Sequence, residues 1–164
     1  MDFAACITRH PLAADPDRAR HVLSLFPALD PALSVLIGGA AGCSPYLAGL
    51  LQKEAGWLPG ALDHDDVVAR ETAGFEDLGA DDLAVALRRA KRRVALLTAL
   101  ADLGGVWTLE QVTGALSDLA DRAVELALRA QVAQERRRAR ARAVRARQED
   151  RDEVAHLADV LPAL

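Results

Sequence analysis

The sequence is poor in the residues that build β-sheets. Only 4% of its 164 residues are aromatic, and it has 2 isoleucines and 13 valines against 34 alanines and 26 leucines. Strands draw on β-branched and aromatic side chains, whereas alanine and leucine favour helix. Hydrophobic residues still make up 51% of the chain, which is enough for a core. These proportions predict an all-α fold, a helical bundle, and argue against a β-sandwich or barrel.

Cysteine is also scarce. Cys6 and Cys43 lie 37 positions apart without CxxC spacing, which supports neither a disulfide framework nor a zinc finger. We therefore expect reduced thiols and a cytoplasmic location. The stretch that ends at Pro11 contains acidic Asp2 and no long apolar run, so we expect no signal peptide.

Long uncharged runs are limited to residues 32–51, whose 20 positions are enough to cross a bilayer. No basic flank or aromatic belt accompanies this run. Its middle contains Gly38, Gly39, Gly42, Ser44 and Pro45. We therefore interpret it as two soluble helices joined by a glycine-rich turn, and we expect no membrane partner.

Catalytic motifs are missing as well. The sequence has no GxSxG, GxxxxGK[ST] or GxGxxG, and no histidine pair with metal-site spacing. Residues 63–66, Asp-His-Asp-Asp, resemble metal ligands, but an EF-hand loop from Asp63 would have Val68 and Gly74 where glycine and glutamate are needed. Acidic residues in first helical turns, where the helix dipole favours them, are the better interpretation. Cys43 lacks the nearby histidine that a catalytic thiolate needs.

Helix starts recur along the first half of the chain. A capping side chain precedes a proline, which suits the first helical position, at Asp15-Pro16, Asp30-Pro31 and Ser44-Pro45. The predicted short helices cover about residues 16–26, 31–38, 45–54 and 64–73. Gly74 is expected near the end of the last one.

The strongest pattern is a pair of apolar stripes with alternating spacings of three and four, which line one face of a helix. The first is Leu83, Leu87, Ala90, Val94, Leu97 and Ala101, and the second is Leu109, Val112, Leu116, Leu119, Ala123, Leu126 and Ala130. Gly104-Gly105 ends the first helix, and Thr108 with Gln111 forms a capping box for the second. We predict an antiparallel hairpin of residues 82–103 and 108–131 as the core.

A first group of arginines lies within the first hairpin helix. It comprises Arg88, Arg89, Arg92 and Arg93, with Lys91 among them. These residues are candidates for binding phosphate or an acidic partner. The alternative, which we favour, is a solvated face that pairs with the eight carboxylates of residues 63–82.

A second group occupies residues 134–147, QERRRARARAVRAR, which contain seven arginines. The candidate partner-binding residues here are Arg136, Arg137, Arg138 and Arg140. Alanine and arginine favour helix, so the second hairpin helix is expected to run past the core, where charged arginines stay solvated. A solvated helix is favoured over one that binds nucleic acid, a membrane surface or an acidic protein. A short final helix, 152–161, is expected to fold back.

The charge differs between the regions that we expect. Residues 1–60 (short helices) and 61–133 (acidic segment and hairpin) are expected to form one domain, followed by the arginine-rich tail 134–164. Residues 1–133 carry 12 basic and 18 acidic groups, or −6, and the tail carries 8 and 6, or +2. A mildly acidic body argues against nucleic acid as a partner.

Three ordered segments resemble one enzyme family. They are residues 41–51 (AGCSPYLAGLL), residues 87–105 with LRRAKRR and ALADLGG, and residues 109–121 (LEQVTGALSDLAD). In order and spacing they are similar to the N-terminal helical region of bifunctional glutamine synthetase adenylyltransferase/adenylyl-removing enzymes. The resemblance covers about residues 12–130.

The resemblance implies the helical lead-in to the nucleotidyltransferase domain that removes AMP from a tyrosine of glutamine synthetase. The family uses Mg²⁺ and ATP, and its G-K-L-G and S-S-D-x-D motifs occur nowhere in this chain. We therefore expect no catalytic, cofactor-binding or metal-binding residues, and a truncated, frame-shifted or degenerate relative. Expected partners are glutamine synthetase or the rest of the parent enzyme. The alternative is a free-standing helical module that binds an acidic partner or nucleic acid through its arginine-rich tail.

Overall fold

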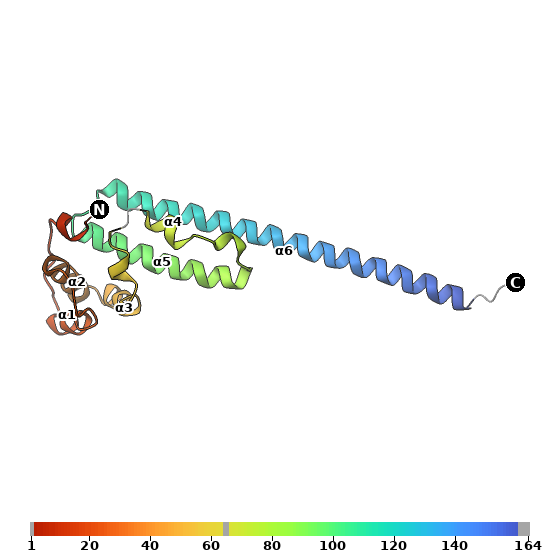
Figure 1. Cartoon of the computed structure of the whole chain (residues 1–164), viewed down its shortest axis with the longest axis horizontal. Coiled ribbons are helices and arrows are strands. Elements are labelled where there is room, and N and C mark those ends of the chain that lie inside the picture. The colour runs from red at the N-terminus through yellow and green to blue at the C-terminus, as the bar shows by residue number, and fades with distance from the viewer. Residues whose placement is uncertain (1, 64–65, 161–164) are drawn as a thin grey trace.

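The computed structural model describes residues 2–63 and 66–160, and all regular elements in these ranges are helical. The helices are α1 (Pro16–Leu23), α2 (Pro31–Cys43), α3 (Pro45–Lys53), α4 (Val67–Glu71), α5 (Ala80–Leu103) and α6 (Leu109–Val160). Helix α5 packs along the first half of α6, α4 contacts both, and α1, α2 and α3 pack together, with α2 and α3 against α5. We call this region the body (residues up to 133). The remainder of α6, the extension (134–160), projects away from the body (Figure 1). The predicted all-α fold is confirmed.

Helices α5 and α6 form the predicted antiparallel hairpin. The chain turns between them at Gly105, whose φ of +66° is a left-handed conformation that suits glycine. The amide of Thr108 donates to Oε1 of Gln111 at 2.8 Å, and the amide of Gln111 donates to Oγ1 of Thr108 at 3.3 Å. The capping box that starts α6 is therefore confirmed.

The core lies where α2 and α3 pack against α5. Its fully buried large side chains include Leu36, Ile37, Leu51, Leu96, Leu97 and Leu100. The first stripe predicted from the sequence faces this core, apart from Leu87, which is partly buried. The hairpin and the short helices therefore share one hydrophobic core.

The second stripe, on α6, is only partly correct. Leu119 and Leu126 are buried, but the side chains of Leu109 and Leu116 are 70% and 44% exposed. Within the described residues, α6 packs mainly on α5, with smaller contacts to α4 and the Phe75–Asp77 turn. Because α6 is covered along one side, it buries fewer side chains than its apolar stripe predicts.

The glycine-rich turn expected within residues 32–51 does not exist. Helix α2 continues through Gly38, Gly39 and Gly42, and the chain turns only at Ser44. Gly38 lies against Leu23 of α1, and Gly39 and Gly42 make room for the N-terminal segment: a Cβ on Gly39 would lie 2.0 Å from the carbonyl oxygen of Pro11. Their role is close packing of backbone against a helix, which the sequence pattern did not distinguish from a turn.

The three predicted caps are confirmed. Side chains of Asp15, Asp30 and Ser44 accept hydrogen bonds from the amides of Arg18 (2.9 Å), Ala32 (2.8 Å) and Leu47 (3.2 Å).

Helix α1 ends earlier than expected and α4 is shorter. The expected first residue of α4, at position 64, lies outside the described residues. Gly74 has a φ of +74° just after α4, as its position suggested.

The expected short final helix, 152–161, is wrong. Helix α6 runs without interruption to Val160, and the side chains described along the extension beyond Gln134 are exposed. Residues 134–160 contain neither glycine nor proline, so no helix-breaking residue interrupts α6 in this range. The expectation that the arginines lie outside the packed core is confirmed. Among the described helices, none is both long and apolar enough to cross a bilayer.

Candidate functional site

The acidic run at residues 63–66 is partly structural. His64 and Asp65 lie outside the described residues. Oδ1 of Asp63 accepts the amide of Phe3 at 3.0 Å and so ties the N-terminal segment to this loop. Elsewhere in the described chain, no group of three or more His, Cys, Asp or Glu side chains is placed to hold a metal ion.

Cys43 lies at the junction of α2 and α3. Its exposed thiol donates to the carbonyl oxygen of Leu12 at 2.8 Å, and Ser44 next to it caps α3. Cys6 is likewise a free thiol. The thiol and hydroxyl at this junction are therefore used in backbone contacts that hold the N-terminal segment and α3.

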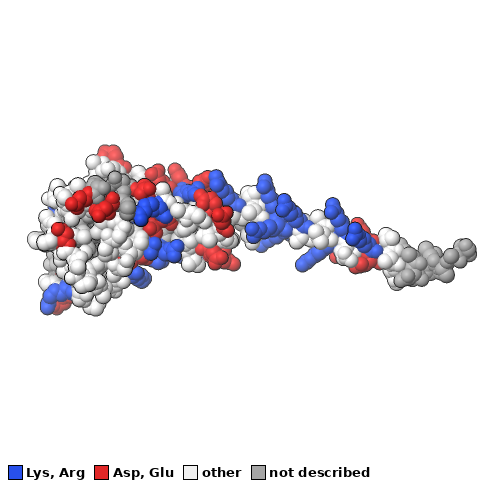
Figure 2. Space-filling model, viewed as in Figure 1, with Lys and Arg blue, Asp and Glu red and all other residues white. Residues whose placement is uncertain are grey.

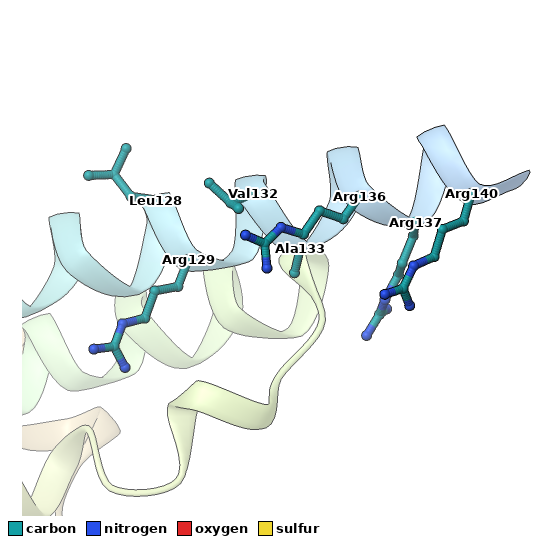
Figure 3. A pocket seen from close by; sticks show the side chains of 7 residues that line it. All are labelled: Leu128, Arg129, Val132, Ala133, Arg136, Arg137 and Arg140. Atoms are coloured by element: carbon teal, nitrogen blue, oxygen red, sulfur yellow. The ribbon is translucent and has the colours of Figure 1, made fainter. Parts of the chain in front are cut away.

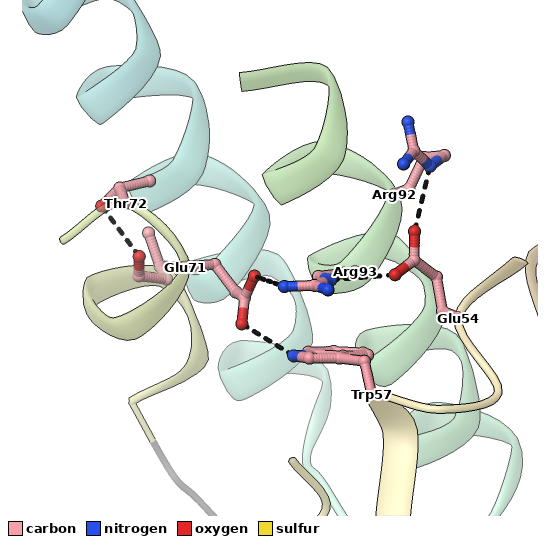
Figure 4. Close-up of polar contacts among 7 residues, drawn as sticks. Glu54, Trp57, Glu71, Thr72, Arg92 and Arg93 are labelled. Carbon is pink, nitrogen blue, oxygen red and sulfur yellow. Dashed lines mark hydrogen bonds and ion pairs between the residues drawn. The ribbon is translucent and has the colours of Figure 1, made fainter. Parts of the chain in front are cut away.

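The first arginine group separates into two pairs. Arg88 and Arg89 are exposed on α5, whereas Arg92 and Arg93 turn toward carboxylates of the body (Figure 4). Nε of Arg92 lies 3.1 Å from Oε1 of Glu54, and Nε of Arg93 lies 2.9 Å from Oε2 of the same carboxylate. The Glu54 side chain is only 4% exposed, so two guanidinium groups compensate one buried negative charge.

Arg93 extends this cluster to α4. Its Nη1 lies 2.9 Å from Oε2 of Glu71, and its guanidinium carbon lies 4.9 Å from the centre of the Trp57 ring. Trp57 in turn donates from Nε1 to Oε1 of Glu71 at 2.9 Å. Burial alone would lower the pKa of Arg93, but the hydrogen bonds to Glu54 and Glu71 outweigh it and raise that pKa. A permanently charged Arg93 therefore links the end of α3 to α4 and α5. We call Glu54, Trp57, Glu71, Arg92 and Arg93 the Glu54 cluster.

We expected pairing between the first arginine group and residues 63–82, and Glu71 provides it for Arg93. The contacts with Glu54 and Trp57 were not expected from the sequence. Glu54 is the single acidic residue between Asp30 and Asp63, immediately after an apolar helix. An isolated acidic residue in such a position was the available signal, because a charge beside a core requires a partner.

The acidic segment also pairs with α6, through Arg122 in the body. Arg122 forms ion pairs with Glu76 and, at 2.8 Å, with Glu125. The backbone hydrogen bond of Glu76 and the guanidinium of Arg122 lower the pKa of the Glu76 carboxyl. This pairing fixes the turn before α5 against α6.

The second arginine group lies on the extension, where arginine side chains gather along α6 (Figure 2). Arg136, Arg137, Arg138 and Arg140 are all exposed. Nη1 of Arg138 lies 2.9 Å from Oε1 of Glu135, within the same helix. The structure thus does not join the two arginine groups into one site: Arg92 and Arg93 stabilise the body, and the second group faces solvent.

The sequence of the chain is similar to one family of known proteins. A profile described as glutamate-ammonia ligase adenylyltransferase matches residues 36–158. A relative from Caulobacter vibrioides is 45% identical over 98 residues, covering 56% of this chain and 10% of the relative. A Bradyrhizobium relative is 36% identical over 159 residues, covering 84% of this chain and 16% of the relative. One from Rhodopseudomonas palustris is 36% identical over 138 residues, covering 76% and 13%.

All three relatives are called bifunctional glutamine synthetase adenylyltransferase/adenylyl-removing enzyme. The chain spans between 10% and 16% of their lengths. No solved structure matches the chain.

Proposed function

Because the chain belongs to the glutamate-ammonia ligase adenylyltransferase family, we propose that it is a non-catalytic helical portion from the N-terminal part of such an enzyme. The match over residues 36–158, in a sequence without G-K-L-G or S-S-D-x-D, carries this proposal. The full activity would transfer AMP to a tyrosine of glutamine synthetase and remove it. Mg²⁺ and ATP would bind outside this chain.

The proposed role is to support that chemistry rather than to perform it. The Glu54 cluster and the α5–α6 hairpin hold α3, α4, α5 and α6 against one another through buried side chains and charge-assisted hydrogen bonds. Such a body suits a rigid element that positions neighbouring parts of an enzyme. Its partners would be the rest of the enzyme or glutamine synthetase itself, in the cytoplasm.

A direct assay tests the first part of the proposal. The purified chain is incubated with adenylylated glutamine synthetase, inorganic phosphate and Mg²⁺, and ADP release is followed. We expect no release above background, because the sequence lacks the S-S-D-x-D motif whose carboxylates would hold Mg²⁺ against phosphate. Turnover by the chain alone would show that the assignment as non-catalytic is wrong.

A complementation assay tests the supporting role. The Caulobacter vibrioides relative is prepared without the segment that aligns to this chain, and the chain is added back. We expect partial recovery of its activity. Leu97→Asp, which disrupts the core, is the matched control and should restore nothing. No recovery, or equal recovery with Leu97→Asp, would contradict a role as a folded support.

A further inference from the structure

Helix α6 carries a surface at the border of body and extension that combines aliphatic side chains with arginines. Leu128, Val132, Arg136 and Arg140 follow one another at intervals of four residues, and Arg137 lies beside them. Together with Arg129 and Ala133 they line a shallow hollow of about 540 Å³, which we call the arginine groove. In Figure 3, Leu128 and Val132 point to the upper side of the helix, and the arginine side chains extend toward its lower side.

The aliphatic half of the groove is uncovered. The side chains of Leu128 and Val132 are 62% and 50% exposed, although both belong to the half of α6 that packs in the body. These two neighbouring aliphatic side chains offer apolar surface that a partner could cover.

The charged half of the groove contains arginines that form no ion pair with any described residue, although Arg137 also lines a neighbouring hollow with Glu76, Asp77 and Asp81. Within the described chain, Arg136, Arg137 and Arg140 form no ion pair, whereas Arg129 pairs with Glu125 at 2.5 Å and Arg138 with Glu135 at 2.9 Å. Three adjacent guanidinium groups that repel one another favour a ligand with several carboxylates or phosphates.

We propose that the arginine groove binds an α-helix of a partner protein that carries aliphatic side chains followed along the same face by carboxylates. Rows of side chains four apart form ridges that fit the grooves of a second helix, crossing at roughly 50°. Aliphatic contacts then lie over Leu128 and Val132, and carboxylates meet the three arginines. The proposal stands on α6 itself and goes beyond the family assignment.

Two other occupants fit the surface less well. A second copy of the groove would bring guanidinium groups against guanidinium groups, which repel. Nucleic acid offers phosphates but nothing for the exposed Leu128 and Val132, and the body carries a net charge of −6. An acidic amphipathic helix satisfies both halves of the groove.

The test uses the full chain and fluorescent synthetic helical peptides. Each peptide has two leucines one turn apart and two glutamates at the same spacing, in either order along the sequence, with a matched version in which glutamine replaces glutamate. Binding is measured by fluorescence anisotropy. We expect the glutamate peptide in one order to bind and its glutamine version to bind about tenfold more weakly.

Matched triple variants locate the site. Arg136→Gln, Arg137→Gln and Arg140→Gln together should weaken peptide binding about tenfold, because arginine and glutamine have similar helix propensity and only the charges are lost. Arg138→Gln, Arg142→Gln and Arg145→Gln remove the same charge from the opposite side of α6 and should leave it unchanged. Equal loss in both variants, or no peptide binding, would overturn the proposal. Circular dichroism checks that both variants keep their helix.

A third variant separates a protein helix from nucleic acid. Leu128→Ala with Val132→Ala should weaken peptide binding severalfold by removing aliphatic contact. Duplex DNA, which contacts charges, should bind the parent and this variant alike. If DNA binds more tightly than the peptides and the aliphatic substitutions affect neither ligand, the groove binds nucleic acid and the proposal is wrong.

Discussion

The two parts of α6 differ in what surrounds them, although they form one uninterrupted helix. In the body, Leu119 and Leu126 are buried against neighbouring helices, and Arg122 is paired with Glu76 and Glu125. In the extension, the described side chains beyond Gln134 are exposed. Helices in water are marginal without tertiary packing, so the extension depends on its intrinsic propensity and on its continuity with the packed part.

Arginine behaves differently in the two regions for the same reason. Arg93 is 22% exposed in its side chain and contacts two carboxylates and an indole ring. Arg136 is exposed and makes no ion pair within the described chain. Arg93 therefore stabilises the fold, whereas Arg136 is available to bind a partner. Neither role can be assigned from arginine content alone.

The largest contrast is expected for a charge placed in each region. Leu97→Asp should lower the free energy of unfolding by about 4 kcal/mol or more, because a carboxylate without a partner would be buried in the core. Val144→Asp, on the exposed extension, should change it by about 0.5 kcal/mol or less. Urea unfolding followed by the fluorescence of Trp57 and Trp107 measures both. Similar effects of the two substitutions would mean that the stripe on α5 is not the core.

A smaller difference in stability is expected between two substitutions of glutamate, one in the body and one on the extension. Glu54→Gln should cost about 2 kcal/mol, because Arg92 and Arg93 lose the buried charge that they share. Glu149→Gln, on the extension, removes the same charge from an exposed side chain and should have little effect. Thermal unfolding of the two variants at equal ionic strength makes the comparison. If Glu54→Gln is as mild as its control, the Glu54 cluster does not stabilise the body.

Much of the fold could be predicted because it depends on local signals. The caps at Asp15, Asp30 and Ser44 need only neighbouring residues, and so does the capping box that begins at Thr108. The family was identified from short segments and is confirmed by a match to residues 36–158, which continues past the expected boundary near residue 130.

What the sequence did not reveal depends on residues far apart in the chain. The glycines of α2 predict a turn when only their neighbours in sequence are considered, because the backbone that packs on Gly39, at Pro11, is distant in sequence. The carboxylate partners of Arg93 lie 39 and 22 positions away, with nothing in the spacing to select them. Leu116 has the periodicity of a core residue, but within the described chain it has too little packed over it to be buried.

Glycines in packed and open surroundings should respond in opposite directions to alanine. Gly39→Ala should cost about 2 kcal/mol, because its Cβ would meet the backbone of Pro11 and the chain there would have to shift. Gly114→Ala, in the part of α6 within the body, has nothing within 4 Å of the new Cβ. It should therefore stabilise the protein by about 0.5–1 kcal/mol through helix propensity. Chemical unfolding checks both signs, and stabilisation by Gly39→Ala would contradict the close packing on α2.

The smallest effect, and a pH-dependent one, is expected at the ion pair between Glu76 and Arg122. The folded state lowers the pKa of Glu76 below its ordinary value of 4.5, so it favours the charged carboxylate. The resulting stability is fully present above that ordinary value and is lost as pH falls through the lower, folded-state pKa. Glu76→Gln should therefore lower the melting temperature slightly at neutral pH, and the difference from the parent should shrink on acidification. Because the two residues act together, Arg122→Gln should reproduce most of the loss at neutral pH, and the double variant should add little to it. A difference that stays constant from neutral pH to the acid limit of folding would mean that the carboxylate charge is not what holds the turn before α5 against α6.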